Sequence, residues 1–243
     1  MDRLIYTVLT GMRARTAAQA VTANNLANAG TTGFRRELSS LASRYLNGAA
    51  DTARVQSDDG VTTSLLDPGS IETTGQPLDV AVTGSGWIAV QAADGSEAYT
   101  RRGDLHVAPT GVLETGDGHP VRGGSGVITV PPATSVRIAS DGMVSITAEG
   151  SPTPIIVDRI KLVDPSAASL QRGADTLFHA ASEADAAPGV RLTTGALEHA
   201  NVDTPGALVE LLEATRGFEM NVKLLGVARD LDEAGAKLMR WDG

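Results

Sequence analysis

The side chains with the greatest potential for chemistry are carboxylates and histidines in the central part of the chain. Asp79 and Asp104 both lie close to glycine turns, and two converging carboxylates are the apparatus of glycoside hydrolysis. Aspartate is also common in turns for local hydrogen bonding, so the sequence favours a structural role for both residues. The 4 histidines lack the i, i+3 or i, i+4 spacing of a helical metal site, and there is no cysteine. We therefore predict no catalytic residue, no metal, no cofactor and no enzymatic activity.

Gly84 and Gly86 follow an apolar strand pattern and match part of a dinucleotide-binding fingerprint. That fingerprint needs a helix N-terminus directly after the glycines to hold a pyrophosphate. Here an alternating strand pattern continues from Trp87, so a β-turn is the better interpretation. A formal net charge of -9 also disfavours nucleic-acid binding, which requires a basic face. The expected partners are proteins rather than a small-molecule substrate or a nucleic acid.

The N-terminal segment has the period of an α-helix. From Ile5 to Leu26, apolar and small residues recur at steps of three and four, which places them on one stripe. Past Met12 the stripe consists mainly of alanine and threonine, which allow another helix to approach closely. Gly30 is expected to be the left-handed residue that ends this helix, and Gly33 a second permissive backbone position. The alanine-rich stripe lacks the bulky band of a membrane-surface helix, so we expect no stable membrane insertion.

A second long helix is predicted near the C-terminus, with Thr204 as its N-cap and Pro205 in the first helical position. Its apolar stripe runs from Leu208 to Leu225 and then drifts to a second line that ends at Leu238. A stripe that stayed on one face of the helix would pack against a single neighbouring helix. The drift therefore predicts that this helix has several helical neighbours.

Between the two helices the period of the apolar residues changes to two. Leu78, Val80 and Val82 begin a series of short alternating runs, which are separated by turn sequences rich in glycine, aspartate and proline. This pattern predicts antiparallel hairpins in a sandwich or partly closed barrel, with a short helix from Asp164 to Gly173. The predicted fold class is α+β, in which long N- and C-terminal helices pair as a coiled-coil-like module and an antiparallel β domain is inserted between them. The predicted domains are a terminal helical assembly module (1–34 and 202–243), an extended connector (35–76 and 190–201) and a β-rich domain (77–189).

Motifs in three parts of the chain carry a family resemblance. The N-terminal motif is Ala-Asn-Asn-Leu-Ala-Asn followed by Thr-Thr-Gly-Phe-Arg, within residues 23–35. The C-terminal motifs lie in 195–203 and 216–219, and the central ones in 78–87 and 99–105. Together they resemble the signatures of the bacterial flagellar basal-body rod and hook proteins, although this chain has Ala-Asn-Val where the family usually has Ser-Asn-Val. The resemblance covers nearly the whole chain.

Within that family, the opening Met1–Tyr6 and the modest length resemble the proximal rod branch most. The distal rod branch usually continues from the first signature with a Lys/Arg-rich stretch and an aromatic segment, which Leu38–Tyr45 does not match. The resemblance implies a structural subunit of the rod, which assembles through its terminal helices into the axial drive-shaft tube. The alternatives are a distal rod or hook-type axial protein, or a periplasmic β-scaffold enzyme or glycan-binding module.

The resemblance also implies partners and a location. The expected partners are other flagellar rod proteins, copies of this chain and the flagellar export apparatus. The expected location is the periplasmic rod of the flagellar basal body, reached without a cleaved signal peptide. The first thirty residues, about the length of a secretory signal, lack the apolar core and cleavage pattern of such a signal, which agrees with that route.

The residues expected to contact other subunits come from both terminal helices and the turn after the first one. Three asparagines lie at the end of the first helix, where amides either cap the last carbonyls or bond to another chain. On the second helix, burial of the apolar stripe is expected to supply most of the contact energy. The predicted subunit-contact residues are Asn24, Asn25, Leu26, Asn28, Thr32, Gly33, Phe34, Arg35, Leu211, Phe218, Val222, Leu225 and Leu231.

Overall fold

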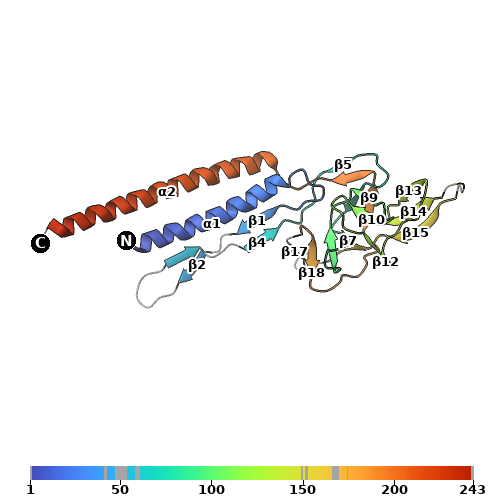
Figure 1. Ribbon diagram of the computed structural model, residues 1–243, viewed down its shortest axis with the longest axis horizontal. Coiled ribbons are helices and arrows are strands. Elements are labelled where there is room, and N and C mark those ends of the chain that lie inside the picture. Colours follow the sequence, from blue (N-terminus) through green and yellow to red (C-terminus); the bar gives the residue numbers. More distant parts are fainter. Residues whose placement is uncertain are drawn as a thin grey trace. The chain divides into compact units, whose positions relative to one another are not determined.

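The computed structural model describes residues 2–40, 43–46, 54–57, 61–148, 150, 153–165, 170–173 and 175–241. The fold is α+β, with antiparallel strands and two long helices in this described part of the chain (Figure 1). The helices are α1 (Asp2–Ala27) and α2 (Thr204–Trp241). The chain divides into unit 1 (Met1–Asn28, Arg36–Leu65 and Val202–Gly243) and unit 2 (Ala29–Arg35 and Leu66–Asn201).

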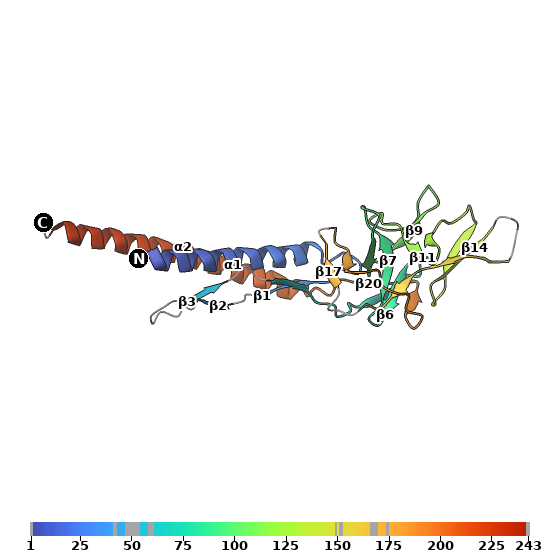
Figure 2. The ribbon, with the colours of Figure 1, turned by 90° about the horizontal axis from the view of Figure 1, so that it is seen from below.

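In unit 1 the two helices lie side by side and run in opposite directions, as Figures 1 and 2 both show. At their contact a Cβ added at Gly217 of α2 would come within 2.1 Å of the Arg15 side chain of α1, and Ala207 is buried near the start of α2. The alanine and threonine stripe that was expected to receive another helix is not covered here, since Thr16, Ala20 and Ala23 are exposed. Two antiparallel hairpins complete unit 1: β1 (Glu37–Ser40) with β4 (Val61–Ser64), and β2 (Ser43–Leu46) with β3 (Arg54–Ser57).

The ends of both helices differ in detail from the sequence prediction. Helix α1 ends at Ala27, and positive φ is found at Gly33 (69°) but not at Gly30. The prediction for Gly30 is wrong because the Asn28 side chain itself donates to the Asn24 carbonyl at 2.9 Å, which satisfies an end group without a left-handed glycine. At the start of α2 the Ala207 N–H donates to the carbonyl of Asp203, so Asp203 and not Thr204 is the N-cap residue.

Unit 2 contains the remaining strands, and all of its pairings are antiparallel. A five-stranded sheet has the order β16 (Leu162–Val163), β7 (Trp87–Gln91), β8 (Glu97–Thr100), β18 (Phe178–Ala180), β17 (Leu170–Arg172). A three-stranded sheet has the order β13 (Ser135–Ile138), β14 (Met143–Thr147), β15 (Ile155–Arg159). The two-stranded pairs are β9 (Leu105–Val107) with β10 (Leu113–Thr115), β11 (Arg122–Gly123) with β12 (Gly126–Val127), β6 (Val80–Thr83) with β19 (Arg191–Thr194), and β5 (Ile71–Thr73) with β20 (Ala196–Glu198).

The core of unit 2 follows from the period of two on β7. Ile88 and Val90 enter the larger apolar cluster, whereas Trp87 and Ala89 enter a second cluster on the other face. In the second cluster the Trp87 and Phe178 rings lie 4.7 Å apart at 51°. Both faces of this central strand are therefore buried, and the sheet has a core on each side.

Two segments contain more β structure than the sequence suggested. The stretch 35–76, expected to be an extended connector, includes β1 to β5, and 190–201 includes β19 and β20. Leu170–Arg172 is a strand paired with β18, so the predicted helix ending at Gly173 is wrong there. The middle of that predicted helix, residues 166–169, lies outside the described residues. These strands are short and largely polar, so the spacing of their apolar residues gave little indication of them. Backbone hydrogen bonds to the neighbouring strands define them instead.

Candidate assembly surface

The last part of the N-terminal signature is built into unit 2. The Gly33 N–H donates to the Glu198 carbonyl at 2.7 Å, and a Cβ at Gly33 would lie 2.4 Å from the Arg101 carbonyl carbon. Phe34 is buried, and the Arg172 guanidinium lies 4.3 Å from the centre of its ring. Thr32 is half-buried. These residues of the predicted contact set thus have defined partners within their own chain.

A buried ionic cluster joins the three parts of the sequence that carry family motifs. Arg35 Nη2 lies 2.6 Å from Glu198 Oε1, and Arg101 Nη1 lies 3.2 Å from Glu198 Oε2. All three side chains are at most 1% exposed. The Gly69 N–H also donates to Glu198 Oε1 at 2.9 Å. We call this group the Arg35–Glu198–Arg101 triad.

Arg101 is buried rather than solvated. The guanidinium lies 5.3 Å from the Trp87 ring centre and donates to the carbonyls of Val82, at 3.1 Å, and Gly84. Burial lowers the pKa of Arg101 from its ordinary value, and the negative charge of Glu198 partly opposes that shift. Arg101 is therefore an internal anchor of unit 2.

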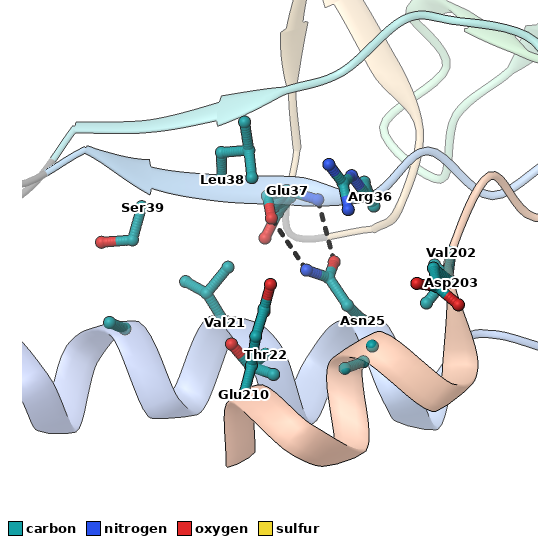
Figure 3. A pocket seen from close by; sticks show the side chains of 13 residues that line it. Val21, Thr22, Asn25, Arg36, Glu37, Leu38, Ser39, Val202, Asp203 and Glu210 are labelled. Atoms are coloured by element: carbon teal, nitrogen blue, oxygen red, sulfur yellow. Dashed lines mark hydrogen bonds between the residues drawn. The ribbon is translucent and has the colours of Figure 1, made fainter. Parts of the chain in front are cut away.

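Unit 1 uses the buried asparagine of the signature to attach its first hairpin. Asn25 Nδ2 donates to the Glu37 carbonyl at 2.8 Å, and Asn25 Oδ1 accepts the Glu37 N–H at 2.8 Å, as drawn in Figure 3. The Asn25 side chain thus makes with Glu37 the pair of hydrogen bonds that a neighbouring strand would make with β1. Asn28 Nδ2 donates to Asn24 Oδ1 at 2.7 Å on the surface, which fits the capping interpretation for that pair. Leu26 is half-buried.

A cavity of about 270 Å³ lies beside this contact, between α1, β1 and the first turns of α2 (Figure 3). Its lining includes the carboxylates of Glu37, Asp203 and Glu210 and the guanidinium of Arg36. Apolar and small side chains from both helices complete it. The cavity lies within unit 1, and its lining brings no histidine together with these acids.

Helix α2 exposes much of its apolar surface. Of the predicted contact residues, Phe218, Val222 and Leu231 are exposed, with Leu231 at 57%, while Leu211 and Leu225 are half-buried. Other large apolar side chains on this helix are exposed as well. The exposed set on α2 is Leu208, Val209, Leu212, Phe218, Met220, Val222, Leu224, Val227 and Leu231. This helix therefore leaves more apolar surface exposed than the isolated apolar side chains usual on a protein surface.

The carboxylates considered for catalysis are held in structural contacts. The backbones of Asp79 and Asp104 form an antiparallel bridge, so the two residues do come close together. However, the Asp104 carboxylate accepts two hydrogen bonds of 2.8 Å from Arg102, and Asp79 accepts one of 2.6 Å from the Thr74 hydroxyl. Both carboxylates thus stabilise local turn structure through these hydrogen bonds.

No group of three or more histidine, aspartate or glutamate side chains among the described residues has the geometry of a metal site. None of the described helices combines the length and the hydropathy needed to cross a membrane.

Three family models match successive parts of the chain. They are described as flagella basal body rod protein (residues 5–35), flagellar hook protein FlgE/F/G D1 domain (81–146) and flagellar basal body rod FlgEFG protein C-terminal (193–238). The matches cover α1 and the turn after it, the core strands of unit 2, and most of α2.

Individual relatives agree with these models. The chain is 39% identical to the flagellar basal-body rod protein FlgF of Escherichia coli, over 95% of both chains. It is 40% identical to FlgF of Salmonella typhimurium, over 93% of both chains. It is 31% identical to the flagellar basal-body rod protein FlgG of Caulobacter vibrioides, over 96% of this chain and 98% of that one. The chain belongs to the flagellar basal-body rod protein family.

Proposed function

We propose that this chain is a structural subunit of the bacterial flagellar basal-body rod, located in its proximal part. The observation that carries this proposal is the identity of 39% and 40% with two FlgF proteins over nearly the full chain. A FlgF and a FlgG of Caulobacter vibrioides are both 31% identical, so the proximal position rests on the other two relatives. A distal rod or hook-type position is the second candidate.

The proposed mode of action is assembly through the terminal helices. The α1–α2 contact includes the small residue Gly217, which supports a coiled-coil-like module that neighbouring chains extend. Each large apolar side chain of α2 that becomes fully buried contributes about 1.5 to 3 kcal/mol. The module comprises 1–34 and 202–243, with the segments 35–76 and 190–201 leading to the β-rich domain at 77–189.

The proposed role requires no catalysis. Copies of this chain, other rod proteins and the flagellar export apparatus are its partners, and the assembled subunit lies in the periplasmic rod after export without cleavage of a signal peptide. The engagement of Asp79 and Asp104 with Thr74 and Arg102 supports this role over glycoside hydrolysis. A free acid and a free base would be needed for that reaction.

The test is deletion of the gene, followed by complementation and inspection of purified basal bodies. We expect the deletion strain to lack hooks and filaments, and the restored wild-type chain to return swimming. Labelled chain should be found in the rod at its proximal end. A deletion strain that swims would contradict the structural role, whereas label at the distal end would contradict only the proximal position.

A further inference from the structure

A cavity of about 450 Å³ lies in unit 2 beside the hairpin of β11 and β12, and we call it the β11 cavity. Its lining contains three basic side chains, one acidic side chain and the backbone of a glycine-rich turn. Of the described residues that line it, Ile160 and Ala186 are the apolar ones. A cavity of this size is within the range of small-molecule sites, and its lining suits a polar ligand.

The carboxylate in the lining, Glu97, already has a full set of hydrogen-bond donors. Its side chain is 1% exposed, and Lys161 Nζ donates to Oε1 at 2.8 Å and to Oε2 at 2.9 Å. Oε1 also accepts the Tyr99 hydroxyl at 2.9 Å, and Oε2 lies 3.1 Å from Arg122 Nη1. A carboxylate has about four acceptor positions, and these contacts occupy them. Glu97 therefore positions two cations and leaves no acceptor for a cationic ligand.

The three basic side chains of the lining, by contrast, keep donors for a ligand. Lys161 has three N–H donors, and its described side-chain contacts all go to the one carboxylate. The described contacts of the Arg122 guanidinium are made by Nη1, so Nε and Nη2 are available. Arg159 donates from Nη2 to Asp141 at 3.1 Å and is 57% exposed. The cavity therefore offers N–H donors and positive charge to an acceptor that enters it.

Backbone hydrogen bonds hold these basic residues in place. The Lys161 N–H donates to the Arg122 carbonyl at 2.9 Å, and the Lys161 carbonyl accepts the Ala89 N–H at 3.0 Å. The segment between β15 and β16 is thus paired on both sides. At the turn of the hairpin, the Gly124 N–H donates to the Arg159 carbonyl at 3.1 Å. Because the basic residues lie on paired strands, little ordering is needed when a ligand binds, which favours affinity.

A smaller cavity of about 220 Å³ adjoins the β11 cavity. The two share Arg159, Ile160 and Ala186, and the smaller one adds Arg191 and Asp141 to the lining. The joint lining has four basic and two acidic side chains, a net charge of 4 minus 2, or +2, although the whole chain carries -9. A concentration of positive charge in an otherwise acidic protein favours an anionic ligand.

The acidic groups around the β11 cavity compete only weakly with such a ligand. Asp158 accepts two backbone N–H groups, at 3.4 and 2.7 Å, and Asp185 does not line the cavity. Glu183 lies 3.2 Å from Arg122 Nη1, but it is 65% exposed. Asp141 pairs with Arg159, which is also largely exposed. Ion pairs at such positions contribute little, so an anion with several charges can replace them.

We propose that the β11 cavity binds a small multivalent anion, whose carboxylate or phosphate groups contact Lys161, Arg122 and Arg159. A monovalent anion would make one such contact, whereas a multivalent one gains several charge-assisted hydrogen bonds at once. The anion is a bound ligand and not a substrate. This inference concerns unit 2 alone, so it stands or falls separately from the proposed function.

Calorimetric titration of the purified full-length chain at fixed ionic strength tests this site. The probes are citrate, which carries carboxylates, and inorganic pyrophosphate, which carries phosphates. We expect saturable binding of at least one of them, and none of the monovalent anion acetate. Binding of citrate alone would identify a carboxylate ligand, and binding of pyrophosphate alone a phosphate ligand. Absence of saturable binding of both probes up to about 10 mM would overturn the proposal.

A pair of arginine variants locates the bound anion. Arg159→Gln removes one exposed cation of the lining and should weaken binding about tenfold. The matched control is Arg137→Gln, which removes the same charge from an exposed position of unit 2 outside both cavities. It should leave the affinity unchanged. Equal weakening by the two substitutions would show attraction to overall charge only and would overturn the site.

A second pair of variants serves if Arg159→Gln impairs folding. Glu183→Gln removes the exposed carboxylate that competes for Arg122, so it should tighten binding about threefold. Glu72→Gln makes the same charge change at an exposed position outside both cavities and should leave the affinity unchanged. Weaker or unchanged binding by the Glu183→Gln variant would overturn the proposal, because the ligand would then not contact Arg122.

Discussion

The two units of this molecule differ in the side chains that they bury and expose. Unit 2 buries charged residues and gives them partners, as the Arg35–Glu198–Arg101 triad shows. Unit 1 leaves large apolar side chains of α2 in contact with solvent, although its own α1 lies alongside. Unit 2 thus pairs its buried charges within one chain, whereas unit 1 leaves apolar surface that the proposed assembly with other helices would cover.

The apolar surface on α2 is the part of the chain with the most to gain from burial in the proposed assembly. Since the side chains concerned are about half exposed, burying them yields a gross gain on the order of 10 kcal/mol before the costs of association. In unit 2, by contrast, residues such as Ile88 and Leu113 are already fully buried. The two regions should therefore respond differently to every change that separates folding from assembly.

The largest expected difference concerns order in the free monomer. Backbone ordering costs about 1 to 2 kcal/mol per residue, and the small residues between α1 and α2 bury little area to offset it. We expect amides in 4–26 and 208–238 to exchange hydrogen at least about a hundredfold faster than those in 78–163. The measurement is hydrogen exchange on dilute full-length chain. Equal protection of the two regions would show that the terminal helices are as well ordered in the monomer as unit 2.

The next largest effect concerns the carboxylate at the centre of the triad. Glu198→Ala leaves two buried guanidinium groups without their counter-ion, so the free energy of unfolding of unit 2 should fall by about 3 to 5 kcal/mol. Urea denaturation followed by Trp87 fluorescence, in a Trp241→Phe background, measures it. The matched control is Glu72→Ala, which removes an exposed carboxylate 2.6 Å from His199 and should cost about 1 kcal/mol or less. A loss below that level for Glu198→Ala would show that the triad is dispensable.

A smaller effect is expected from two glycines in the turn of unit 2. Gly33→Ala introduces a Cβ into a left-handed residue and against the Arg101 backbone, so it should destabilise unit 2 by about 2 kcal/mol or more. Gly30→Ala meets no atom within 4 Å and should change stability by less than about 1 kcal/mol. The same denaturation experiment compares them. Similar losses for both variants would mean that the turn tolerates no side chain at all.

The smallest effect belongs to the buried amide of unit 1. Asn25→Ala leaves the Glu37 N–H and carbonyl without their side-chain partners, which costs about 1 to 3 kcal/mol. Exchange of the Glu37 amide in assembled basal bodies, where α1 is expected to be ordered, should accelerate accordingly. Asn24→Ala removes an exposed amide and should alter that rate by less than about threefold. If Asn25→Ala has no effect on Glu37 but blocks assembly, the amide acts between chains instead.

The sequence predicted the parts of the fold that depend on periodicity. The period of three to four gave α1 and α2, and the period of two gave β6 and β7, because each pattern reflects one buried face. The exact ends of the helices could not be predicted from periodicity, since they depend on which nearby group forms hydrogen bonds with the end groups of the helix backbone. Asn28 does so in α1 instead of Gly30, and Asp203 in α2 instead of Thr204.

The triad could not be predicted in the same way. Arg101 and Glu198 are 97 positions apart, and no spacing rule pairs residues across such a distance. Charged side chains are usually exposed, so burial of Arg101 is not expected from its residue type. One signal was present: each triad member lies in a different family motif. The apolar residues of α2 were equally visible in the sequence, but their exposure depends on where α1 packs.

The position of Glu198 in the chain has a consequence for the time at which unit 2 can fold. Arg35 precedes Glu198 by 163 residues, so both triad arginines leave the ribosome long before the carboxylate that neutralises them. A nascent chain that lacks this carboxylate would have to bury two uncompensated positive charges, which is strongly unfavourable. The triad can therefore close only when translation has nearly ended.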